Sequence, residues 1–244
     1  MQAEAYILMA QVENEHWWWR GRRAVLRSVL GRYAPESGAG RTVLEVGCGS
    51  GGNLPMLSLY GTLCAVELDD GARTQAVQRG LARVEKGWLP DGLPFDGERF
   101  DLIAALDVLE HIDDDRGSLR ALRERLSPNG LLLLTVPAYM WLWSSQDEFS
   151  HHRRRYTRSQ CVSLVRDSGL EVLYSSYFNT LLFPLAVARI ALSNLFGGSG
   201  DAAVKKPPGL LNCALKGIFA SEGAVLPRLS FPYGLSIVVC ARAK

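Results

Sequence analysis

The stretch of sequence that decides the fold is Val43-Leu44-Glu45-Val46-Gly47-Cys48-Gly49-Ser50-Gly51. Its apolar first half predicts a buried strand over 42–46, and its glycines predict a tight turn into a helix over 53–60. Glycines lack a Cβ, so the chain can turn sharply and a ligand can approach the backbone closely. In open α/β sheets such a loop lies at the carboxyl edge, where ligands bind.

An acidic residue follows this loop at a spacing that indicates a nucleoside. Glu67 comes 20 positions after Gly47, next to a second strand expected over 62–66. A carboxylate in this place accepts hydrogen bonds from a ribose diol. The loop and the acid together predict a nucleoside-type cofactor site, and the alternative is a structural turn with a solvated Glu67.

Short apolar runs alternate with helical stretches over the rest of the chain. We expect further strands at 100–105, 131–136, 171–177 and 235–241, and helices at 70–79, 113–126 and 157–168. Near-continuous apolar strands separated by helices are typical of a parallel sheet covered on both faces. The pattern predicts an α/β fold with a doubly wound, mostly parallel sheet.

Two segments lie outside this core, which comprises 41–177 and 230–244. Residues 1–40 predict an N-terminal helical arm, and residues 178–229 predict an apolar helical insertion or cap. The arm carries three consecutive tryptophans (Trp17, Trp18 and Trp19). Three such residues fan over about 200° of a helix, so at least one indole must face a neighbouring element or the cofactor cleft.

Composition and charge exclude a disordered, a collagenous and a disulfide-stapled protein. The 244 residues are 48% hydrophobic and carry 27 Lys+Arg against 25 Asp+Glu, which is ordinary for a globular protein. The near-balanced charge favours neither nucleic acid nor an anionic membrane as a partner. Five scattered cysteines without a Cys-x-x-Cys pair indicate reduced thiols. We therefore expect a cytoplasmic protein.

The longest apolar stretch, 181–196, is interrupted by Pro184 and Arg189 and is shorter than the ~20 residues of a membrane span. It can cover an apolar substrate, form a homodimer interface or rest on a membrane surface. With Phe219 and Leu226 it offers more apolar surface than the core requires. The sequence leaves these three roles open.

The glycine loop admits two classes of cofactor. Gly47-x-Gly49-x-x-Gly52 fits the dinucleotide fingerprint, which would place a pyrophosphate at the helix N-terminus. Glu45 is expected to point into the same pocket from the preceding strand. A carboxylate repels a diphosphate and attracts an ammonium and a sulfonium. This argument favours S-adenosylmethionine, and an NAD-dependent oxidoreductase is the alternative.

Several motifs resemble those of class I S-adenosylmethionine-dependent methyltransferases. They are Val43–Gly51, Leu93-Pro94-Phe95, Phe100–Ile103, Asp107-Val108-Leu109-Glu110-His111 and Leu126–Leu131. Together they cover about 41–137. The resemblance implies a Rossmann-like sheet of seven strands whose last strand is antiparallel, and it implies transfer of a methyl group.

The resemblance also implies which residues contact the cofactor. Those around its methionine half would be Glu45, Gly47, Cys48, Gly49 and Gly51. Glu67 would hold the ribose hydroxyls, Leu68 would touch the adenine, and Asp107 would face the transferring methyl group. Many relatives place an acid after the third strand, where this chain has Gly87-Trp88-Leu89. Trp88 stacking on the purine beside the Leu89 backbone, and ordinary packing of Trp88, both stay open.

Relatives with a similar aromatic and arginine-rich arm fold it over the site as a lid. By this analogy one of Arg20, Arg22 or Arg23 pairs with the methionine carboxylate, and we take Arg22 with Trp18 as the contacts. An arm packed on the edge of the sheet is the alternative.

Transfer of a methyl group to a hydroxyl requires a base. His111 is one candidate, although Glu110-His111 can instead cap the next helix. Helical spacing would pair Asp147 with His151, whereas the resemblance points to His152 through His152-Arg153-Arg154-Arg155-Tyr156. We take His111 and His152 as the catalytic candidates.

The arginines in and after this motif (Arg153, Arg154, Arg155 and Arg158) either clamp an anionic substrate or pair with nearby acids. No set of His, Asp and Glu has the spacing of metal ligands, so we expect no metal. The sequence predicts an S-adenosylmethionine-dependent O-methyltransferase of a small molecule, lipid-like or a glycan precursor. A non-catalytic protein that binds the same cofactor is the second alternative.

Overall fold

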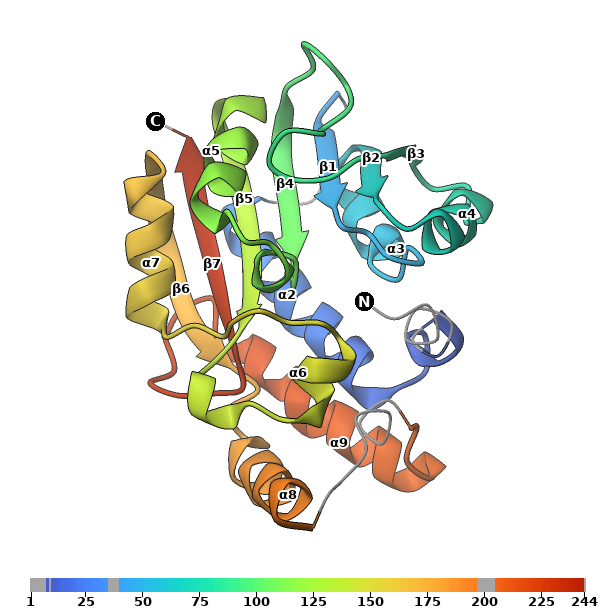
Figure 1. Ribbon diagram of the computed structural model, residues 1–244, viewed down its shortest axis with the longest axis vertical. Helices are drawn as coiled ribbons and strands as arrows, with labels where there is room; N and C mark the ends of the chain where they lie inside the picture. Colours follow the sequence, from blue (N-terminus) through green and yellow to red (C-terminus); the bar gives the residue numbers. More distant parts are fainter. Residues whose placement is uncertain (1–7, 9, 35–39, 197–204, 244) are drawn as a thin grey trace.

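The computed structural model describes residues 8, 10–34, 40–196 and 205–243. Its centre is a seven-stranded sheet in the order β3-β2-β1-β4-β5-β7-β6, with helices on both faces (Figure 1). The strands are β1 (Thr42–Val46), β2 (Thr62–Glu67), β3 (Arg83–Lys86), β4 (Phe100–Leu106), β5 (Leu126–Pro137), β6 (Leu170–Phe178) and β7 (Ser236–Ala243). β7 runs antiparallel to both of its neighbours, and the other pairs are parallel. The predicted fold class and its reversed last strand are confirmed.

Several of the connecting helices begin at a side chain that caps them. They are α3 (Leu54–Leu57), α4 (Asp70–Gln78), α5 (Asp115–Arg125), α6 (Ser145–Phe149) and α7 (Arg158–Asp167). Asp69 accepts a hydrogen bond from the Ala72 N–H, and Asp114 accepts one from the Gly117 N–H, each at 2.8 Å. These contacts satisfy backbone donors that the first turn leaves unpaired. The helix expected over 53–60 is α3 followed by a 3-10 turn, Ser58–Tyr60.

The sheet separates two apolar cores. Successive residues of β7 alternate between them, since Ile237 and Val239 pack with α5 and α7 while Val238 and Cys240 pack on the opposite face. The second face is covered by α2 (Trp17–Tyr33), α3 and α9 (Gly209–Ser221). The first face carries α5 and α7, in front of the sheet in Figure 1.

Helices α2 and α9, which are far apart in sequence, lie against each other. Gly21 allows this contact, because a Cβ there would approach Phe219 Cδ1 to 2.6 Å. Phe219 and Leu226 are fully buried in this core. The expectation that these two side chains are surplus apolar surface is therefore wrong, because α2 covers the first and the core encloses both.

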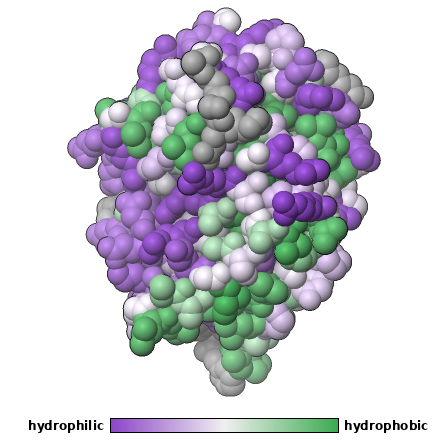
Figure 2. Space-filling model, turned by 180° about the vertical axis from the view of Figure 1, so that it is seen from behind, coloured by the Kyte–Doolittle hydropathy of each residue, from purple (hydrophilic) through white to green (hydrophobic). Residues whose placement is uncertain are grey.

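Helix α8 (Phe183–Phe196) keeps much of its apolar surface exposed, with 61% of Leu185 and 75% of Leu195 accessible. Figure 2 shows hydrophobic side chains gathered over the lower part of the molecule, where Figure 1 places α8 and α9. Among the helices that the structure describes, none is long and apolar enough to cross a membrane. The division into arm, core and cap stays a prediction.

Candidate active site

A cavity of about 1290 Å³ opens beside the glycine loop that follows β1. Its walls come from the arm, the ends of β2 and β4, the segment after β5, and α8. The predicted residues that line it are Trp18, Arg22, Gly47, Cys48, Gly49, Glu67, Leu68, Trp88, Leu89, Asp107, His111 and His152. The fold thus brings together residues that are more than 130 positions apart in the sequence.

The glycine loop has the backbone that its sequence predicts. Gly47 and Gly49 have φ angles of 69° and 55°, in the left-handed region that favours glycine. A Cβ on Gly47 would lie 2.7 Å from a methyl carbon of Val108. The Glu67 carboxylate accepts N–H hydrogen bonds from Gly49 (2.7 Å) and Asp69 (2.9 Å). Glu67 is thereby fixed against the loop at the end of β2.

Glu45 does not lie where the charge argument requires it. Its side chain is fully buried and, among the described residues, it is not one that lines the cavity. Oε1 accepts a hydrogen bond from Asn53 Nδ2 at 2.9 Å, and burial raises the pKa of Glu45 to about 8. The carboxyl group is thus mostly protonated at neutral pH, and the expected anion in the pocket is wrong. Gly51 also lies outside the cavity wall, where a Cβ would meet Leu54 and Arg79.

The arm is anchored on the glycine loop by an acid that sequence reasoning missed. Glu13 accepts a hydrogen bond from Ser50 Oγ at 2.8 Å and forms an ion pair with Arg79. Its carboxylate also lies over Gly52, where a Cβ would come within 2.1 Å of Oε2. Glu13 is 6% exposed, and its burial raises its pKa. No local signal marks this residue, because its partners lie 37 and 66 positions away.

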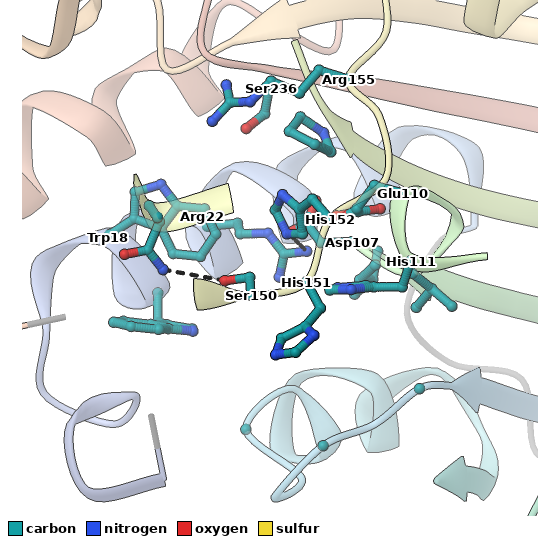
Figure 3. Close-up of a pocket in the computed structure, with 18 of the residues that line it drawn as sticks. Trp18, Arg22, Asp107, Glu110, His111, Ser150, His151, His152, Arg155 and Ser236 are labelled. Carbon is teal, nitrogen blue, oxygen red and sulfur yellow. Dashed lines mark hydrogen bonds and ion pairs between the residues drawn. The ribbon is translucent and has the colours of Figure 1, made fainter. Parts of the chain in front are cut away.

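Arg22 crosses the cavity wall from α2 to the end of β4 (Figure 3). One guanidinium nitrogen, Nη2, lies 2.7 Å from Asp107 Oδ2 and donates to Thr135 Oγ1 at 2.9 Å. Thr135 in turn donates to Asp107 Oδ1 at 3.0 Å. The guanidinium also lies 5.4 Å from the centre of the Trp18 ring, within cation–π distance. This buried network places Trp18, Arg22 and Asp107 on one side of the cavity.

The three tryptophans of the arm all line the cavity but have different neighbours. Trp17 packs edge-on against Phe219 of α9, with ring centres 6.1 Å apart. Trp18 and Trp19 meet at right angles at 5.3 Å. His16 caps the helix by accepting the Trp18 N–H through Nδ1 at 3.1 Å. The prediction that at least one indole faces a neighbour or the cleft is confirmed.

The residues expected around the adenine lie at the far wall. Trp88 is 52% exposed, and its ring lies over Gly92, where a Cβ would come within 2.3 Å of it. Leu89 is buried and Leu68 is 56% exposed, and both line the cavity. Trp88 thus packs on its own turn and still presents surface to the cavity.

Glu110, His111 and His152 lie together on the wall near Asp107 (Figure 3). The two imidazole centres are 4.8 Å apart. Glu110 is fully buried, and neither carboxylate oxygen has a hydrogen-bond partner among the described residues. Burial and the nearby Asp107 raise the pKa of Glu110 well above its usual range. Burial and His152 lower the pKa of His111 to about 4, so this ring is neutral at neutral pH.

Asp147 contacts His152 and not His151. Oδ1 of Asp147 lies 2.8 Å from Nδ1 of His152. The i, i+4 argument is wrong because α6 ends at Phe149 and His151 has a φ of 54°, which turns the chain out of the helix. His151 is consequently exposed, and the fifth residue after Asp147 occupies the place beside its carboxylate.

The arginines after His152 pair with acids. Arg153 contacts Asp113, Arg154 contacts Asp115 at 3.0 Å, and Arg155 contacts Asp147 at 2.7 Å. These pairs support the interpretation of the cluster as charges balanced within the fold. Arg153 and Arg155 nevertheless line the cavity.

Residues 18–175 match the family model described as "Methyltransferase domain", which is more than half of the chain. The chain belongs to this methyltransferase family. Class I methyltransferase domains use S-adenosylmethionine as methyl donor, which decides between the two cofactors that the glycine loop admits. The NAD-dependent alternative is therefore wrong, although the carboxyl group of Glu45 is not what excludes it.

The methyltransferase is similar to curated and solved proteins. It is 29% identical over 157 residues to the ubiquinone biosynthesis O-methyltransferase of Cereibacter sphaeroides (strain KD131 / KCTC 12085). The match covers 57% of this chain and 63% of that protein, so the chain spans less than two thirds of the relative's length.

Solved structures show the same fold. A methyltransferase from Thermotoga maritima, titled a possible histamine N-methyltransferase, gives a TM-score of 0.56 at 17% identity and covers 98% of this chain and 99% of that one. The [4+2]-cyclase SpnF gives a TM-score of 0.57 at 20% identity, and the match covers 91% of this chain and 81% of the cyclase. At these identities the likeness concerns the fold alone.

Spacing along the sequence does not indicate the histidine and carboxylate cluster of this methyltransferase. One ligand-type atom each from Glu110, His111 and His152 lie within 4.8 Å of one another. The expectation of no metal rested on spacing along the sequence, which could not reveal this cluster, and it stays a prediction. His152 comes 41 positions after His111, and the segment after β5 brings it back to the end of β4.

Proposed function

We propose that the protein is an S-adenosylmethionine-dependent O-methyltransferase that acts on a small molecule. The observation that carries this proposal is one cavity that joins the glycine loop to the histidine pair. Its volume of about 1290 Å³ exceeds the roughly 300–1,000 Å³ of a pocket for one ligand. There is thus room for the cofactor and for an acceptor beside it.

One half of the cavity fits S-adenosylmethionine. Gly47 and Gly49 expose backbone without Cβ atoms, and the Glu67 carboxylate, which lines the cavity, is of the acceptor type that binds ribose hydroxyls. Trp88 and Leu68 would enclose the adenine. When bound, the cofactor supplies an electrophilic methyl group on its sulfonium.

Arg22 and Asp107 lie between this half and the histidine pair. Arg22 has a buried Nε with no partner among the described residues, so it retains a donor for the methionine carboxylate. Asp107 would hold the other end of the Arg22 guanidinium and face the methyl group. The arm would act as a lid, because Glu13 anchors it on the loop and Trp18 closes the cavity beside Arg22.

The acceptor would lie between the histidine pair and α8. Ala186, Ile190 and Leu192 form an apolar part of the cavity wall, which suits a molecule with an apolar portion. The curated relatives are named for ubiquinone biosynthesis, which agrees with a lipid-like phenol as acceptor. His111 or His152 would accept the proton of its hydroxyl, so that the oxygen can attack the methyl carbon in line with the sulfonium.

A methyl-transfer assay with mass detection tests this function. The protein is incubated with S-adenosylmethionine carrying a trideuterated methyl group and with hydroxylated aromatics that differ in the length of an isoprenoid chain. We expect a product heavier by one labelled methyl group, formed faster with the apolar chain. Cofactor binding without any methylated product, from these compounds or from a small-molecule extract, would instead identify a non-catalytic binding protein.

A further inference from the structure

The cluster formed by Glu110, His111 and His152 is built like a metal site with open positions. It combines two imidazoles and one carboxylate, the ligand types that Zn²⁺, Fe²⁺ and Mn²⁺ accept. Ligand atoms about 2.1 Å from a tetrahedral metal lie about 3.4 Å apart. The three groups here lie within 4.8 Å of one another, so small side-chain rotations bring them onto one ion.

Glu110 supplies the reason for a cation at this place. Its carboxylate is fully buried, and both oxygens are without a hydrogen-bond partner among the described residues. The guanidinium groups of Arg22 and Arg155 are each matched by another acid, Asp107 and Asp147 respectively. Buried polar atoms without a partner are costly, and a bound metal ion would supply the partner that both Glu110 oxygens lack among the described residues.

The second layer of contacts also matches a metal site. Asp147 is completely buried and accepts from Nδ1 of His152, which leaves the ring's other nitrogen, Nε2, as its lone-pair nitrogen. A ligating histidine typically donates its other N–H to such a carboxylate, which fixes the tautomer and the direction of the ring. Asp147 is itself fixed by Arg155 at 2.7 and 2.8 Å.

We propose that Glu110, His111 and His152 bind one divalent transition-metal ion whose open coordination positions face the cavity. Three protein ligands with remaining positions open is the arrangement of a catalytic metal. The second part of the inference rests on the proposed function: the acceptor hydroxyl would bind in an open position, and the two histidines would then be metal ligands instead of bases. Coordination would lower the pKa of that hydroxyl, its proton would leave to solvent water, and the oxygen would then attack the methyl group.

Titration of chelator-treated protein with Zn²⁺ or Co²⁺ tests the site directly. We expect one ion per chain in a tight phase, with visible Co²⁺ absorption that reports the nitrogen ligands. Glu110→Gln and His152→Asn should each weaken this phase at least 100-fold. His151→Asn is the matched control, because His151 is adjacent and exposed and lies outside the cluster, and it should bind like the wild type. Thermal melting confirms that the variants are folded.

Three results would overturn the metal site: wild-type protein without a stoichiometric tight phase, unchanged binding in both ligand variants, or equal loss in His151→Asn. Titration of the metal-free protein with S-adenosylmethionine separates this proposal from the proposed function. Cofactor binding and methyl transfer that persist in full after chelation would leave the methyltransferase assignment intact and refute the metal's part in the reaction. Metal binding without cofactor binding would refute the proposed function alone.

Discussion

Nδ1 of His152 lies 2.8 Å from Oδ1 of Asp147, and this contact fixes which nitrogen of the ring carries its proton. Burial raises the pKa of Asp147, but hydrogen bonds from His152 and Arg155 outweigh it and lower the pKa to about 2. The carboxylate is therefore ionised at neutral pH and accepts the Nδ1 proton. The lone pair of a neutral His152 is then on Nε2, whether it receives a proton or binds a metal.

Replacement of Asp147 by Asn should impair the reaction more than the binding of the cofactor. An amide no longer selects the Nδ1 tautomer, and loss of such a supporting contact typically costs 10–100-fold in activity or metal affinity. We expect kcat to fall by about 10–100-fold, with the Kd for S-adenosylmethionine within about twofold of the wild-type value. Steady-state kinetics and calorimetry measure the two quantities.

Glu148→Gln is the control for this change, because Glu148 is the exposed neighbour of Asp147 on α6. It should leave both quantities unaltered. An Asp147→Asn protein that is folded and has wild-type kcat would show that the orientation of His152 is irrelevant to the reaction.

Replacement of Glu67 by Ala should weaken binding of S-adenosylmethionine at least tenfold. The carboxylate would contact the ribose hydroxyls, and it also holds the N–H groups of Gly49 and Asp69. Calorimetry with Glu124→Ala as the control, an exposed acid on α5, measures the effect. Unchanged affinity in the Glu67 variant would exclude the ribose assignment.

Glu45 should make the folded protein less stable as pH rises. Its pKa is about 8 in the fold against an ordinary value of 4.5, so between these values only the unfolded chain releases the proton. The free energy of unfolding then falls by up to about 1.4 kcal/mol per pH unit in this window. Glu45→Gln removes this loss and keeps an acceptor for Asn53 Nδ2.

Melting temperatures of wild-type and Glu45→Gln protein, measured without cofactor from pH 5 to pH 8, check this prediction. The melting temperature of the variant, relative to that of the wild type, should rise with each step upward in pH. Parallel curves would mean that the Glu45 carboxyl group ionises normally inside the fold.

Glu13 offers a test of the arm as a lid. Glu13→Gln removes the charge that pairs with Arg79 and weakens the contact with Ser50 on the glycine loop. We expect the Kd for S-adenosylmethionine to rise about 3–10-fold, mainly through faster dissociation in stopped-flow measurements. Glu15→Gln is the matched control, since Glu15 is exposed on the same arm and pairs with Lys206. Equal dissociation rates in both variants would argue against a closing role for the arm.

The elements that the sequence predicts well are those with local causes. The strand over 42–46 and the left-handed turn at Gly47 follow from an apolar run and from residues without a Cβ. The caps at Asp69 and Thr157 follow from side chains that bond within three residues of themselves. Such contacts depend on short stretches of chain, so their pattern is present in the sequence itself.

The parts of the site that escaped prediction depend on tertiary packing. Glu45 is turned toward Asn53, between Ala65 and Ala104 on the neighbouring strands, which leave space for a buried carboxyl group. The approach of His152 to Glu110 and the contact of Glu13 with the glycine loop join distant segments. No periodicity or local spacing indicates which distant segments will meet.

The packing of α2 on α9 has a consequence for synthesis of the chain. Gly21 leaves the ribosome 198 residues before its partner Phe219. At 5–20 residues per second, the arm remains without this partner for roughly 10–40 s. A growing chain can therefore form its central strands early, but the wall that carries Trp18 and Arg22 is completed only after α9 has been translated.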